Sequence, residues 1–174
     1  MSRAATALSL LPGLAVAGLL LAAPPVQEPP PADGWSTFEG SWSAAGERDA
    51  LPTEGDRPAA ILSVSGAIVL SRGEGLGRGF RGQAIGYDDG RTTSIGRAVW
   101  TDDRGDLLFS ELKGEPVRTG RRVVGTFTGG TGRYGGVQGD YELTWQHVVQ
   151  AEPGVVQVVT VALKGRFRRD GVPR

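Results

Sequence analysis

Residues 127–145 read FTGGTGRYGGVQGDYELTW, and this stretch combines a turn signal with a strand signal. Residues 129–136 are rich in glycine, which adopts backbone conformations that other residues avoid and so favours a tight turn. After them, Tyr141, Leu143 and Trp145 alternate with polar residues, and a period of two predicts a half-buried β-strand. We therefore expect a sharp turn that leads directly into a strand.

The same period of two recurs along the rest of the chain. Turn residues such as Asp88, Asp89 and Gly90 separate the alternating segments and predict a tight hairpin, and a polar loop is expected over residues 45–58. Gly or Pro interrupts every longer segment of helical spacing after residue 34, so we expect little helix. We predict eight strands, over residues 35–44, 59–71, 79–87, 91–101, 106–113, 121–128, 139–149 and 155–167.

Eight sequential strands leave two exposed edges unless the sheet closes, and an up-and-down barrel removes both edges. Glycines inside the strands, such as Gly82, Gly96 and Gly125, permit the bends that a small barrel needs. We therefore predict an all-β protein with an eight-stranded antiparallel up-and-down β-barrel, in preference to a β-sandwich. A barrel of this size is either filled by side chains or holds one small ligand.

The N-terminal residues differ in character from the barrel. Residues 1–23 contain one charged residue, Arg3, and then a run rich in Leu and Ala, which is typical of a secretory signal peptide. Residues 24–34 are rich in proline and predict an extended tether, and the barrel domain is expected over residues 35–170. These features indicate an exported protein, periplasmic or extracellular. An uncleaved N-terminal anchor is the alternative, because the apolar run is just long enough to span a bilayer.

Composition narrows the classes of function. The 174 residues include 19 Lys+Arg and 19 Asp+Glu, so the chain lacks the basic excess typical of nucleic-acid-binding proteins. The sequence lacks an amphipathic basic helix, the usual signal for binding to a membrane surface, so we do not expect such binding. With no Cys and a single His, Cys-based zinc sites, iron–sulfur clusters and sites that need two imidazoles are excluded. We expect no cofactor and no metal, and we interpret Asp102, Asp103 and Asp106 as hairpin residues rather than calcium ligands.

The glycine-rich turn carries a family resemblance. Its residues Gly129, Gly130, Thr131, Gly132, Arg133, Tyr134 and Gly139 resemble the GGTGRF/Y…G signature of the allene oxide cyclase and dirigent barrel superfamily. The resemblance implies a calycin-like, allene oxide cyclase-like barrel, in which this turn links two late strands and shapes the barrel. Within this superfamily the chain resembles bacterial-style secreted members. The resemblance also implies that an apolar small molecule binds or reacts in the lumen without a cofactor. It further implies that the protein forms trimers. The residues to which we assign a structural role in the turn are Gly129, Gly130, Gly132, Tyr134 and Gly139.

Aromatic side chains supply the candidate ligand site. They are spread over most of the predicted strands, where they form the core or, if the lumen is open, its apolar lining. His147 shares a strand face with Tyr141 and Trp145, where it would orient a ligand or move a proton; the alternative is a strand-end histidine bonded to a backbone carbonyl. Glu39 and Arg97 are out of phase with neighbouring aromatics and are expected to face solvent. The candidate ligand-binding residues are Phe38, Trp42, Trp100, Tyr141, Trp145 and His147.

Two classes of function stay open. The first is a binding or accessory module for an apolar small molecule, or a purely structural envelope protein. The second is a cofactor-free isomerase or cyclase of the allene oxide cyclase type. Residues 155–163 are apolar on both strand faces, which indicates an interface in a homo-oligomer unless the predicted loop over residues 45–58 covers them.

Export predicts a defined N-terminus for the mature protein. Signal peptidase requires small residues before its cleavage site, so the mature chain is expected to start after Ala22 or Ala23. N-terminal sequencing of the secreted protein tests this prediction. Recovery of the full-length chain from the cytosol would contradict it.

Overall fold

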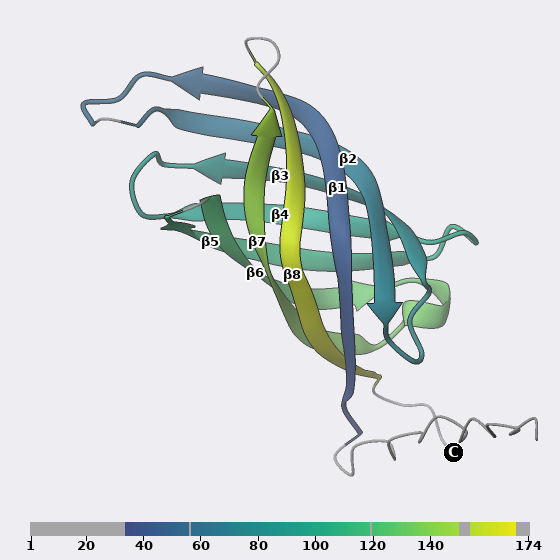
Figure 1. The fold of residues 1–174 in the computed structure, drawn as a ribbon. Helices are drawn as coiled ribbons and strands as arrows, with labels where there is room; N and C mark the ends of the chain where they lie inside the picture. The colour runs from purple at the N-terminus through teal and green to yellow at the C-terminus, as the bar shows by residue number, and fades with distance from the viewer. Residues whose placement is uncertain (1–33, 56, 119, 150–153, 170–174) are drawn as a thin grey trace, which may run out of the picture.

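The computed structural model describes residues 34–55, 57–118, 120–149 and 154–169, and these form a closed antiparallel barrel (Figure 1). Each strand pairs with the next one in the chain, and β1 pairs with β8, so the sheet has no open edge. The strands are β1 (Ser36–Leu51), β2 (Ala59–Arg72), β3 (Gly79–Asp88), β4 (Ser94–Thr101), β5 (Leu107–Val117), β6 (Gly120–Gly130), β7 (Val137–Val149) and β8 (Val155–Arg169). The predicted signal peptide, residues 24–33 of the predicted tether and residue 170 lie outside the described residues.

The predicted all-β class and the eight-stranded antiparallel barrel are confirmed. In the part of the chain that the structure describes, the one helical segment is the short 3-10 helix η1 (Gly132–Tyr134). No helix in these residues is long and apolar enough to cross a membrane. The β1–β2, β3–β4 and β5–β6 connections lie at one end of the barrel, termed the open end, and η1 lies at the other, termed the closed end (Figure 1).

The predicted polar loop over residues 45–58 is wrong in its first half. β1 continues to Leu51, which pairs with Ala59 of β2. Gly46 and Arg48 are half-buried while their neighbours in β1 are exposed, so the alternation persists through residues that give no apolar signal. Backbone hydrogen bonds hold this part of the strand, and the loop that was to cover β8 does not exist over residues 45–51.

The predicted tight hairpin at residues 88–90 is wider in the structure. β3 ends at Asp88 and β4 begins at Ser94, so five residues connect the two strands. The carboxylate of Asp89 organises this loop, because its Oδ1 accepts hydrogen bonds from the backbone N–H groups of Arg91, Thr92 and Thr93. An aspartate that satisfies three backbone donors stabilises a wider loop than the two-residue turn that the sequence suggests.

Large aromatic side chains point into the barrel and account for most of its core. Trp42, Trp100 and Tyr141 are almost completely buried. Gly125 makes room for the ring of Tyr141, since a Cβ at that position would lie 2.1 Å from the ring carbon Cζ. On the outer face, Arg97 forms an ion pair with Glu111 across β4 and β5. Arg97 and Glu39 are both exposed, as predicted.

β8 does not keep strict alternation. Its pairing with β7 shifts near Ala162, which has a φ of 56°. This irregularity turns Leu163 into the core, whereas strict alternation groups Leu163 with Val155 and Val161, which are exposed. The broader exposed apolar surface lies instead on the outer face of β2, β3 and β4. Its side chains are Ile61, Ile85, Tyr87 and Ile95.

The β6–β7 connection contains the glycine-rich turn. Gly132 has a φ of 49°, in the left-handed region that favours glycine, and a Cβ there would lie 1.9 Å from Oδ1 of Asp106. Thr131 ties the turn to β5, because its backbone N–H donates to the carbonyl of Leu107 and its hydroxyl accepts the N–H of Leu107. Tyr134 follows and is fully buried.

The remaining turn glycines also lie where a side chain would not fit easily. Gly129 and Gly139 have φ values of 142° and 154°. A Cβ at Gly139 would lie 2.1 Å from the carbonyl oxygen of Arg166, and one at Gly130 would lie 2.6 Å from that of Leu107. The turn therefore depends on close approach of backbone to backbone at Gly130 and Gly139, and on a left-handed φ at Gly129.

Replacement of Gly132 is expected to destabilise the fold. Gly132→Val forces a β-branched residue into the left-handed region and against Asp106, at a cost of about 3 kcal/mol. For a domain of this size that is a fall in Tm of about 10 °C by circular dichroism. The matched control is Gly79→Val, because a Cβ at Gly79 has nothing within 4 Å. Equal Tm values for the two variants would contradict the proposed role of Gly132.

Candidate functional site

The interior of the barrel is filled toward the closed end. Phe38, Trp100, Phe127 and Tyr141 form one cluster of rings, with centroids 4.9 Å apart for Trp100 and Tyr141 and 5.5 Å apart for Trp100 and Phe127. The hydroxyl of Tyr141 lies 2.8 Å from Oγ of Ser110, so its polar end is satisfied inside the core. Among the described residues, side chains occupy this half of the lumen.

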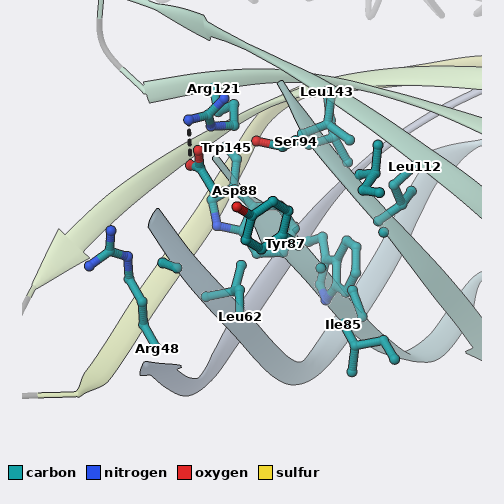
Figure 2. A pocket seen from close by; sticks show the side chains of 18 residues that line it. Arg48, Leu62, Ile85, Tyr87, Asp88, Ser94, Leu112, Arg121, Leu143 and Trp145 are labelled. Atoms are coloured by element: carbon teal, nitrogen blue, oxygen red, sulfur yellow. Dashed lines mark hydrogen bonds and ion pairs between the residues drawn. The ribbon is translucent and has the colours of Figure 1, made fainter. Parts of the chain in front are cut away.

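The other half contains an apolar cavity of about 110 Å³ that opens toward the open end (Figure 2). The indole rings of Trp42 and Trp145 meet there edge to face, 5.0 Å apart, and separate the cavity from the filled half. Small residues leave the space free: Gly86 of β3 pairs with Gly96 of β4, and both line the cavity. The branched apolar side chains around it are Leu62, Leu112, Val123 and Leu143.

An ion pair borders the mouth of the cavity. Nη2 of Arg121 in β6 donates to Oδ2 of Asp88 in β3 (Figure 2). Oδ1 of Asp88 accepts the backbone N–H of Gly90 at 2.8 Å. Arg48 of β1 also lines the cavity. The apolar space therefore ends at a charged rim.

Several polar atoms around the cavity have no partner in the described part of the chain. They are the indole N–H groups of Trp42 and Trp145, the hydroxyl of Ser94 and Nη1 of Arg121. A buried donor without an acceptor costs about 1–3 kcal/mol. An acceptor group on a bound molecule is one way to satisfy such donors.

A second, polar hollow of about 370 Å³ lies at the same end of the barrel. It shares Arg48, Asp88 and Arg121 with the rim of the cavity. The β1–β2 and β5–β6 connections add Arg57 and Arg118 to its walls. We refer to Arg48, Arg57, Arg118 and Arg121 as the rim arginines.

The structure divides the predicted ligand-binding residues into two groups. Trp42 and Trp145 line the cavity, whereas Phe38, Trp100 and Tyr141 lie in the filled half and do not. His147 pairs with Val158 in the sheet, and its side chain lies outside what the structure describes.

Sequence reasoning missed the polar part of the site, namely Arg48, Asp88, Ser94 and Arg121. A signal was present for Arg121, because it is in phase with the inward-facing Val123 and Phe127 along β6. Arg48 carried the same signal relative to Trp42, but the predicted loop ended the strand before it. At the barrel rim these charged residues at the strand ends line the cavity.

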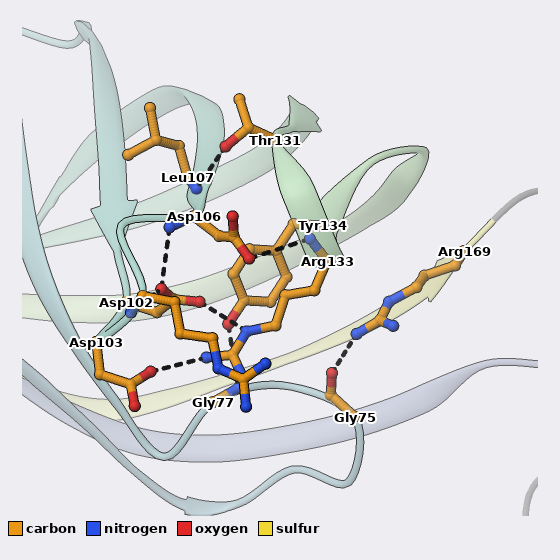
Figure 3. A network of polar contacts seen from close by, with 11 residues as sticks. Gly75, Gly77, Asp102, Asp103, Asp106, Leu107, Thr131, Arg133, Tyr134 and Arg169 are labelled. Atoms are coloured by element: carbon orange, nitrogen blue, oxygen red, sulfur yellow. Dashed lines mark hydrogen bonds and ion pairs between the residues drawn. The ribbon is translucent and has the colours of Figure 1, made fainter.

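A polar network fastens the closed end (Figure 3). Nε of Arg133 lies 2.7 Å from Oδ2 of the buried Asp102, and Nη2 of Arg133 lies 3.1 Å from Asp103. Burial works against the ionised form of Asp102, but hydrogen bonds from the backbone N–H of Arg104, from the Tyr134 hydroxyl and from Arg133 outweigh it. The pKa of Asp102 therefore lies below its usual value. These carboxylates serve the turn that seals the barrel.

Comparison with models of known families, with curated proteins and with solved structures finds no match to this chain. The superfamily membership suggested by the turn signature stays a prediction.

Tyr141 is expected to make stability fall at high pH. Burial raises the pKa of Tyr141 to about 12, and the hydrogen bond with Ser110 opposes this rise only in part. The unfolded tyrosine ionises near pH 10, so the folded state loses stability as the pH rises from about 10 to 12, by up to about 3 kcal/mol. Urea unfolding of the protein and of Tyr141→Phe between pH 8 and pH 12 measures the difference. Parallel pH profiles for the two proteins would contradict this prediction.

Proposed function

We propose that this protein is an exported binding barrel that holds a small, largely apolar molecule at its open end. The observation that carries the proposal is the cavity between the Trp42–Trp145 pair and the charged rim. Export rests on the signal-peptide pattern of residues 1–23. A cavity of about 150 Å³ holds benzene in another protein, so about 110 Å³ suits a short alkyl chain or a small ring.

Two features favour a binding function over a purely structural one. The paired glycines Gly86 and Gly96 leave their part of the cavity wall without side chains, and a Cβ on either would lie 3.0 Å or less from a carbonyl oxygen of the neighbouring strand. The free indole N–H groups of Trp42 and Trp145 favour a ligand that carries a hydrogen-bond acceptor next to its apolar part.

The described groups at the cavity also favour binding over catalysis of the cyclase type. Asp88 is the carboxylate that lines the cavity, and both of its oxygens already accept hydrogen bonds, from Gly90 and Arg121. A substrate would therefore have to compete with the Gly90 N–H and with Arg121 for these oxygens, which leaves Asp88 poorly placed to take a proton from it.

Assembly into a homo-oligomer, such as the trimer that the resemblance implies, stays a prediction. The expected interface between subunits moves from β8 to β2, β3 and β4, because the exposed apolar side chains of these three strands form a broader surface than those of β8. Sedimentation of the mature protein at micromolar concentration measures its oligomeric state.

Filling the cavity is expected to abolish binding. Burial of about five methylene groups at about 0.8 kcal/mol each gives 1-hexanol a Kd near 1 mM, which calorimetry can measure. Leu62→Trp places an indole beside Gly86, across the strand pair, and is expected to weaken hexanol binding at least tenfold. The matched control is Leu51→Trp, because Leu51 is exposed on the outside of β1. Loss of binding in both variants, or in neither, would contradict the proposed site.

A further inference from the structure

The rim arginines concentrate positive charge at the open end. Arg48, Arg57 and Arg118 make no side-chain hydrogen bond or ion pair with any described residue, and Nη1 of Arg121 has no partner there either. The one carboxylate among the described residues that line the hollow, Asp88, is already bound to Arg121 and to the backbone of Gly90. Among the described residues that line this hollow, arginines therefore outnumber carboxylates, and the net charge is positive.

Such an arrangement is unfavourable unless something neutralises it. All four rim arginines line one hollow of about 370 Å³, and over so short a range salt screens the repulsion between their charges only in part, since the Debye length is about 8 Å at physiological ionic strength. The chain as a whole carries equal numbers of basic and acidic residues, so this local excess does not reflect its composition. An anion of more than one charge relieves the repulsion and accepts the free N–H donors.

The polar hollow and the apolar cavity share a border. Arg48, Asp88 and Arg121 line both spaces, so a molecule with a polar head and an apolar tail can occupy the two together. In Figure 2 the Arg121–Asp88 pair lies next to the apolar side chains of the cavity, which places the boundary between head and tail at that pair.

We propose that the rim arginines bind a tetrahedral oxyanion head of charge near minus two, such as a phosphate monoester, whose short apolar tail enters the cavity. This inference rests on the proposed function, because the same cavity holds the tail. It adds the chemical class of the head group and the residues that recognise it.

The number of donors favours a phosphate monoester over a carboxylate. One guanidinium satisfies the two oxygens of a carboxylate through a pair of parallel hydrogen bonds. A phosphate monoester offers three terminal oxygens and a charge of about −1.5 to −2 at pH 7, which matches several arginines around one hollow. Four rim arginines exceed what a carboxylate needs.

Calorimetry with hexyl phosphate, heptanoate, 1-hexanol and inorganic phosphate tests this inference on the mature chain. Hexyl phosphate is expected to bind at least tenfold more tightly than hexanol at low salt and at least threefold more tightly than heptanoate, with an affinity that falls as salt rises. Arg57→Gln and Arg118→Gln are each expected to weaken hexyl phosphate binding at least fivefold and to leave hexanol binding unchanged. Arg97→Gln is the control, because Arg97 lies on the outer face of β4, paired with Glu111.

The outcomes separate the two proposals. If hexanol binds and hexyl phosphate binds no more tightly, the head-group site is overturned and the proposed function stands. If heptanoate equals hexyl phosphate, the preference for a doubly charged head is overturned. If inorganic phosphate binds through Arg57 and Arg118 while hexanol does not bind, the anion site is supported and the apolar site is overturned. If none of the four binds, both proposals fail.

Discussion

The lumen of an eight-stranded barrel has a nearly fixed width, so the volume of the inward side chains decides what the protein can hold. Toward the closed end, Trp100, Phe127 and Tyr141 fill the whole cross-section. Toward the open end, Gly86 and Gly96 face each other across neighbouring strands and add no volume at all. The cavity, its apolar wall and its charged rim all follow from this uneven distribution of side-chain size along the barrel axis.

The uneven filling has an energetic cost that the closed end offsets. Around a cavity of about 110 Å³ the lining side chains make fewer packing contacts than side chains in a filled core do. The packed rings and the Asp102–Arg133 network supply stability at the opposite end, and the turn at Gly132 closes the barrel beneath them. A protein selected for stability alone gains by filling the cavity, which larger residues at a few inward positions would do. Retention of the space is therefore an argument for a ligand that fills it.

Alternation and turn residues were enough to predict the class, the strand number and the closure of this fold, because backbone pairing depends on those two signals. These two signals failed at positions where the polarity of a residue does not indicate whether it is buried. Gly46 and Arg48 extend β1 without an apolar residue, and Ala162 shifts the phase of β8 without any sequence mark. For the site, aromatic content identified Trp42 and Trp145 but did not separate them from Phe38 or Trp100. That distinction depends on which inward positions are glycine on the neighbouring strands, and so on the register of strand pairing, which only the structure supplies.

The two ends of the barrel use arginine in opposite ways. At the closed end, Arg133 is matched by Asp102 and Asp103, so its charge is neutralised within the protein and serves the fold. At the open end, Arg57 and Arg118 line a hollow whose one carboxylate among the described residues, Asp88, is already paired with Arg121. Matched arginines stabilise a structure, whereas unmatched ones raise the local concentration of anions and speed their arrival. The unmatched arginines sit at the mouth of the apolar cavity. Their electric field therefore draws a negatively charged head group toward the place where an apolar tail can be buried.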